Sequence, residues 1–226
     1  MTLNYNDIKY ELLNTIRSGD IFTISERGVT TTTETFVGTT GTYTLLHAPG
    51  RNIRCVINTT ESETLKYGRD YIPIFTYSAD GSRMYIVSIQ LLYSYTATDE
   101  FSITYDYGST EKIYPDWIQE NLTIGSFPRL GFTFLKGNTE VIATDSVEAT
   151  RFRMTFIIKA KSVDYVNDRL TALRQLFKNN QNTLHYSNIL RVVNIEPADD
   201  AGEVGGHKIF QATMDVMNEL NIERKN

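Results

Sequence analysis

The chain has one cysteine, Cys55, and only three histidines among 226 residues. A single cysteine excludes a disulfide within the chain and favours a reducing compartment. The histidines, His47, His185 and His207, are far apart and have no cysteine or carboxylate at the spacing of a zinc site. We therefore expect no metal, no cofactor and a buried, unreactive thiol.

Motifs of catalysis are also missing. No serine or cysteine stands in a nucleophile motif, and the glycines of 202–206 precede a predicted strand, whereas a phosphate-binding loop precedes a helix. Asp99, Glu100 and Asp106 could form a carboxylate pair for sugar hydrolysis, but turn and strand-surface roles account for them. The sequence therefore predicts that the protein is not an enzyme.

Long apolar runs and a basic domain are absent as well. No apolar run approaches 18 residues and no charged-then-apolar leader opens the chain, so neither a membrane span nor a signal peptide is expected. The net charge is −5, and residues 1–117 carry 9 Lys and Arg against 14 Asp and Glu, while residues 118–226 carry 13 of each. A general nucleic-acid binder is not expected, although a local basic strip remains compatible with these numbers.

The pattern along the chain divides it into three regions. The first is a helix over Asn6–Ser18, with apolar residues at helical spacing, followed by a short strand over 21–25. The second, about 30–115, has alternating and aromatic runs separated by turn residues, which predicts a β-sandwich or small barrel. It holds ten of the 14 tyrosines, which suit half-buried sheet faces or a binding surface.

The third region mixes helix and strand. Phe127–Lys136 and Glu140–Ala143 are predicted as two strands joined at Gly137-Asn138. Residues 184–195 are predicted as another strand, with a turn over 185–188 as the alternative for its first part. Residues 197–206 have the composition of a flexible loop, and Ile209–Met217 closes as a strand.

The most informative segment is a strand over 151–161 that continues directly into an amphipathic helix over 162–180. Side chains alternate between the faces of a strand. One face therefore carries apolar side chains, Phe152, Met154, Phe156, Ile158 and Ala160, and the helix adds an apolar stripe of Val163, Val166, Leu170, Leu173 and Phe177.

The opposite face of that strand carries a basic row with one apolar residue: Arg151, Arg153, Ile157, Lys159 and Lys161. These residues are candidates for a subunit interface or for a lumen that contacts nucleic acid. The alternative is a solvated sheet face or an edge guarded against aggregation by its cations. Ile157 favours contact with protein, because an exposed apolar side chain gains most when another protein covers it.

Neither the opening helix nor its following strand has an obvious partner in the β-rich region. The sequence therefore predicts an α+β fold interrupted by an insertion: residues 1–29 plus 117–226 form one domain with a small mixed sheet and two helices, and residues 30–116 form an all-β sandwich.

Taken in order, the ends of the chain resemble the tail-terminator and tail-completion proteins of tailed bacteriophages. The resemblance depends on the opening helix, the strand pair over 127–143, the long strand running into one helix over 151–180, and two closing strands over 184–217. The insertion, with Gly41-Thr-Tyr-Thr-Leu, Arg51-Asn-Ile-Arg-Cys-Val and Gly68-Arg-Asp-Tyr, is similar to immunoglobulin-like modules that decorate phage virions.

The resemblance implies a virion protein made in the host cytoplasm. Members of that family form a ring, usually hexameric, that caps the tail tube, stops its polymerisation and joins it to the neck or connector. The implied partners are further copies of the chain, the tail tube protein and the neck protein, with transient, non-specific contact to genomic DNA passing through and no membrane. The other interpretation is a host-surface or carbohydrate-binding tail module that uses the tyrosine-rich insertion.

Overall fold

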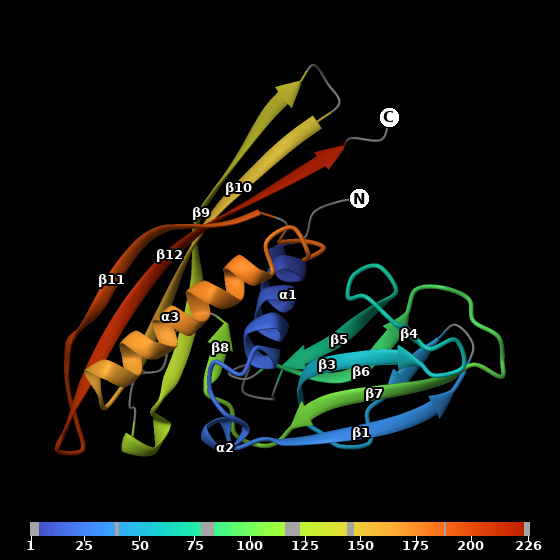
Figure 1. Cartoon of the computed structure of the whole chain (residues 1–226), viewed down its shortest axis with the longest axis horizontal. Coiled ribbons are helices and arrows are strands. Elements are labelled where there is room, and N and C mark those ends of the chain that lie inside the picture. Colours follow the sequence, from blue (N-terminus) through green and yellow to red (C-terminus); the bar gives the residue numbers. More distant parts are fainter. Residues whose placement is uncertain are drawn as a thin grey trace. The chain divides into compact units, whose positions relative to one another are not determined.

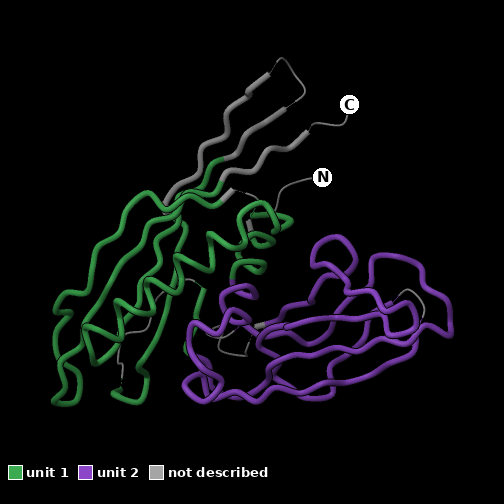
Figure 2. The backbone as a smooth tube through the Cα atoms, in the orientation of Figure 1, with its two compact units in different colours: residues 1–12, 112–226 green, residues 13–111 purple. Residues whose placement is uncertain are grey.

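The computed structural model describes residues 5–38, 41–77, 84–115, 123–143, 147–187 and 189–223, and their side chains except at 5, 77, 135–143, 147–150, 189 and 219–223. The chain forms two compact units, shown in different colours in Figure 2. Unit 1 contains residues 1–12 and 112–226, and unit 2 contains residues 13–111. The fold mixes helix with a larger share of strand, 51%.

The boundaries of the units differ from the predicted ones at 29/30 and 116/117. Residues 13–29 belong to unit 2, because the last part of helix α1 (Tyr5–Ser18) is bonded to strand β3 (Gly50–Asn58). The side-chain amide of Asn14 donates to the carbonyl of Ile53 and accepts from its N–H. The other boundary moves to 111/112, since strand β8 (Ile113–Pro115) pairs with the sheet of unit 1; position 116 itself lies outside the described residues.

Unit 1 is built on one five-stranded sheet with helix α3 (Val163–Asn179) packed along it (Figure 1). Its strand order is β11-β12-β10-β9-β8, antiparallel except for the parallel pair β8–β9. The remaining elements are β9 (Arg129–Ala143), β10 (Val147–Ala160), β11 (Ile189–Val204), β12 (His207–Glu223) and the short 3-10 helix η1 (Ile124–Ser126). Because β11 ends the order, one long edge of the sheet pairs with no further strand among the described residues.

Helix α3 forms where the sequence predicts it. Ser162 caps it by accepting a hydrogen bond from the backbone N–H of Tyr165. Four residues of the predicted stripe are buried against the sheet: Val166, Leu170, Leu173 and Phe177. The fifth, Val163, is 37% exposed, because it begins the helix one turn before the packed face.

Two local predictions for unit 1 are wrong. Gly137-Asn138 is not a turn: β9 is continuous, and both residues pair with β10, opposite Phe152 and Arg151. Residues 197–206 are not a loop, since β11 extends to Val204 and turns into β12 at Gly205-Gly206. Pairing with a neighbouring strand outweighs the local turn and loop composition in both places.

The first part of α1 belongs to unit 1 through a buried carboxylate. Glu11 is 3% exposed, and its two oxygens accept hydrogen bonds from the backbone N–H groups of His185, Tyr186 and Ser187. Ile8 and Leu12, on the same helix, are fully buried. This single side chain thus satisfies three donors in the segment that leads from α3 to β11.

Burial raises the pKa of Glu11 to about 6, although the three N–H donors oppose that shift. The folded-state pKa lies above the ordinary value of 4.5, so this group favours the folded state most below pH 4.5 and less as the pH rises through 6. Between pH 4.5 and neutral pH, we expect the free energy of unfolding of the wild type to fall by about 2 kcal/mol more than that of Glu11→Gln. Urea unfolding at several pH values measures this, and identical pH profiles would contradict it.

Unit 2 is built on one seven-stranded sheet whose pairings fall into two groups. The first group is β4, β3, β7 and β1, the second is β2, β6 and β5, and the register pair Gly50–Ile86 joins them. A Cβ on Gly50 would lie 2.9 Å from the carbonyl oxygen of Ile86, so glycine permits this close approach. The strands are β1 (Thr30–Val37), β2 (Thr42–Thr44), β3, β4 (Glu63–Thr64), β5 (Tyr71–Tyr77), β6 (Met84–Leu91) and β7 (Glu100–Tyr107).

The core of unit 2 contains side chains from both groups of strands, including Val56 of β3, Ile89 of β6 and Ile103 of β7. The strand order differs from that of an immunoglobulin domain, in which the last strand lies at the edge of its sheet. Here β7 lies between β1 and β3. The all-β character of this region is as predicted, but its strands form one seven-stranded sheet, and the immunoglobulin-like strand order is wrong.

The predicted strand over 21–25 is also wrong. This segment leads into a short helix, α2 (Ile24–Arg27). Thr23 and Glu26 form a reciprocal capping box, and Gly28 ends the helix with φ 69°. The local capping signal therefore outweighs the short apolar run.

Candidate assembly surface

Strand β10 has the two faces that the sequence predicts. The five apolar residues from Phe152 to Ala160 are each at most 4% exposed. Phe156 lies at the centre, with ring centroids 5.2 Å from Phe132 of β9 and 5.0 Å from Phe177 of α3. This inner face is the core of unit 1.

The outer face, directed away from α3, carries the predicted basic row. Arg151, Ile157 and Lys159 are half-buried, and Arg153 is exposed. Lys161 is exposed too, but it follows the end of the strand and precedes the cap of α3. Four of the five predicted residues therefore share one strand face, and the fifth lies beyond its end.

Arg153 is partly neutralised, which the sequence did not reveal. Its guanidinium forms an ion pair with Asp215 of β12, and the hydroxyl of Thr155 donates to the same carboxylate at 2.7 Å. Burial alone would raise the pKa of Asp215, but the bonds from Thr155 and Arg153 outweigh it and lower that pKa. Because the Arg153 side chain is still 49% exposed, it remains accessible to a partner.

Lys159 lies beside a second cation that sequence reasoning missed. It is in register with Arg129 of β9, whose guanidinium lies over the ring of Tyr114 at 5.0 Å from the centroid. Burial lowers the pKa of Lys159, and the charge of Arg129 lowers it further. At this end of the row, half-buried Lys159 thus lies in register with a buried arginine that packs on an aromatic ring.

Register pairing extends the other end of the row onto the edge strand. Arg153 pairs with Met217 of β12, and Met217 pairs with Arg191 of β11. Arg191 is exposed, and residues in register on one sheet face lie beside one another. Arg191 thus extends the predicted basic row onto β11. From here on, the name basic row refers only to its arginine end, Arg151, Arg153 and Arg191.

Beyond Arg191 the same edge strand becomes acidic. Four exposed carboxylates follow within eight residues, and we call them the acidic hairpin: Glu196, Asp199, Asp200 and Glu203. A hollow of about 590 Å³ is lined by Glu196–Ala201 of β11 with Gln211 and Thr213 of β12. Three register irregularities between β11 and β12 shape this stretch.

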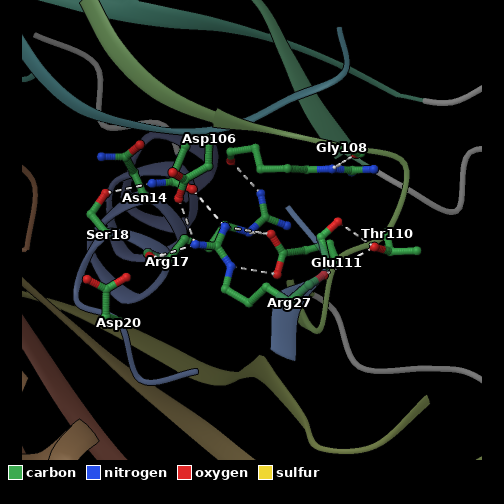
Figure 3. A network of polar contacts seen from close by, with 12 residues as sticks. Asn14, Arg17, Ser18, Asp20, Arg27, Asp106, Gly108, Thr110 and Glu111 are labelled. Carbon is green, nitrogen blue, oxygen red and sulfur yellow. Dashed lines mark hydrogen bonds and ion pairs between the residues drawn. The ribbon is translucent and has the colours of Figure 1, made fainter. Parts of the chain in front are cut away.

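Unit 2 contains a separate cluster of charges, which Figure 3 shows from close by. Arg27 is fully buried and donates to Asp106, to both oxygens of Glu111, to the side chain of Asn52 and to the carbonyl of Arg17. Burial alone would lower the pKa of Arg27, but the charges of Glu111 and Asp106 raise it. The cluster therefore holds its guanidinium in the charged form.

The same cluster joins the first and last segments of unit 2. Arg17 is 3.4 Å from Glu111, and Arg54 bridges Asp106 and Asp20. Asp106, one of the carboxylates weighed for sugar hydrolysis, is thus held by Arg27 and Arg54. The arrangement is that of a structural ion network, in which each charge has an opposite partner.

The tyrosines of unit 2 mainly pack within it. Tyr71 and Tyr105 are buried, Tyr93 is 52% exposed, and five more are half-buried: Tyr43, Tyr67, Tyr85, Tyr95 and Tyr107. Tyr114, counted with them in the sequence, belongs to unit 1. Their placement favours the interpretation of half-buried sheet faces over a recognition surface.

The remaining features concern the cysteine, metal ligands and membrane-spanning helices. Cys55 is only partly buried, not fully as expected. Among the described residues no group of histidines, cysteines and carboxylates could hold a metal ion. No helix in the described part of the chain has the length and apolar character needed to cross a membrane.

No protein-family model and no curated protein matches this chain.

Proposed function

We propose that the protein is a non-enzymatic structural component of a tailed-phage virion, which forms a ring that ends the tail tube and joins it to the neck. One observation carries the proposal. The sheet of unit 1 has a helix along its inner face, while its outer face presents charged residues around half-buried Ile157 and its β11 edge stays unpaired among the described strands. An open edge and an open face are the surfaces that subunits of an assembly cover.

The order of elements supports the same proposal. Unit 1 contains the first part of the opening helix α1, then β9, β10 with a two-residue connection into α3, and the closing hairpin β11–β12. This order agrees with the one on which the resemblance to tail-terminator proteins depends, except that the single strand β9 replaces the predicted strand pair over 127–143. In this proposal unit 2 is a decoration on the virion, and neighbouring copies, the tail tube and the neck protein cover the sheet.

Negative-stain electron microscopy of the purified full chain tests the proposal. We expect closed rings of uniform size with a central hole. Small particles without a hole, at any protein concentration, would contradict it.

A further inference from the structure

The exposed charges of unit 1 are separated along one strand. Arg191 lies near the start of β11, and the acidic hairpin occupies its second half. Glu196 follows Arg191 by five positions and Glu203 follows it by twelve, which at about 3.3 Å per position is at most roughly 17 Å and 40 Å. The two surfaces therefore do not overlap.

The acidic hairpin has little internal compensation. Asp200 lies 3.5 Å from Lys208, which is the one ion pair shown for these four carboxylates in the described part of unit 1. Asp199 accepts from the backbone of Asp200, and Glu196 accepts from the side chain of Asn194, so neither meets a cation there. Glu196, Asp199 and Asp200 line the hollow, and exposed carboxylates there favour a partner with cationic side chains.

The β11 edge is poorly suited to adding a further strand. Its three register irregularities interrupt the regular spacing of backbone groups, and Pro197 lacks an N–H. A partner would therefore bind through side chains. The basic row, whose Arg191 precedes the hairpin by five residues on the same strand, offers guanidinium groups of the complementary charge.

We propose that the acidic hairpin of one copy binds the basic row of a second copy. This inference rests on the proposed function, since it assigns the two surfaces that join neighbours in the ring. Because different patches of the two copies meet, the contact is head-to-tail, leaves one free patch at each end, and propagates until the ring closes. A two-fold dimer would require one self-complementary patch instead.

Complementary charge reversal in the full chain tests this proposal. Asp199→Lys with Glu203→Lys reverses the hairpin, and Arg191→Glu reverses the exposed end of the basic row without disturbing the Arg153–Asp215 pair. Each variant alone is expected to sediment as a monomer at concentrations where wild type is assembled. Mixing the two variants, or combining all three substitutions in one chain, is expected to restore the assembly.

Matched controls reverse exposed charges on α3, at Asp168→Lys and Arg174→Glu, and are expected to assemble like wild type. Circular dichroism checks that every variant is folded. The wild-type assembly should also dissociate as salt rises toward about 0.5 M, because surface charges are screened.

The outcomes separate the inference from the proposed function. A wild type that is always monomeric contradicts both. Wild-type rings that persist in both reversal variants, or that the charge swap fails to restore, overturn the inference and leave the ring proposal standing.

Discussion

Replacing Arg27 with methionine is expected to lower the free energy of unfolding of unit 2 by about 3–5 kcal/mol. The substitution removes the donor shared by Asp106, Glu111 and Asn52 and leaves buried carboxylates short of a cation. Urea unfolding measures the loss, and hydrogen exchange at the amides of β3 and β7 places it in unit 2.

Arg69→Met is the matched control within the same unit. Arg69 also pairs with carboxylates, Asp70 and Glu63, but its side chain is 45% exposed, so the expected loss is much smaller than that of Arg27→Met. A second control adds Glu111→Gln to Arg27→Met. If the ion network is structural, the two losses are strongly non-additive; simple additivity, or equal losses for Arg27 and Arg69, would refute the account.

Alanine substitutions at two neighbouring residues of β10 are expected to separate stability from assembly. Phe156→Ala removes a fully buried ring that contacts Phe132 and Phe177, and should cost about 3–5 kcal/mol of stability. Ile157→Ala changes a half-buried residue on the outer face and should cost about 1 kcal/mol in the isolated chain.

For assembly, the substitution on the outer face is expected to have the larger effect of the two. Ile157→Ala should weaken the association of copies, while a folded Phe156→Ala chain, studied in mild conditions, should still associate. Urea unfolding and light scattering on both variants provide the comparison. If Ile157→Ala assembled like wild type, the outer face of β10 would have no part in the interface.

Periodicity alone predicts the most regular parts of unit 1. The alternation over 152–160 and the helical stripe from Val166 to Phe177 each require one buried face, and the structure buries both. The helix over Asn6–Ser18 follows from the same rule. Such signals are local and repeat several times, which makes them readable from one sequence.

Composition misled where a strand lies at an edge or is paired along its whole length. Pro197 and the nearby glycines indicate a loop, yet an edge strand tolerates proline because one side of it needs no donor. Gly137-Asn138 indicates a turn, but pairing with β10 decides its conformation. The Thr23–Glu26 capping box was readable and would have replaced the predicted strand over 21–25.

The charge clusters were not readable in this way. Arg27 and Glu111 are 84 residues apart, and Arg153 and Asp215 are 62 apart, so only the fold brings them together. The basic row was predicted from one strand, while Arg191 joins it only through the register of β12. Pairings between distant segments follow from topology, which a local pattern does not encode.

In the proposed ring, the open sheet of unit 1 binds copies of the same chain. Multi-angle light scattering on the eluting wild-type protein tests it most directly, since the chain mass is 25.8 kDa. We expect one species whose mass is a fixed multiple of that value, and it should persist on dilution. A mass of 25.8 kDa at every concentration would contradict the account.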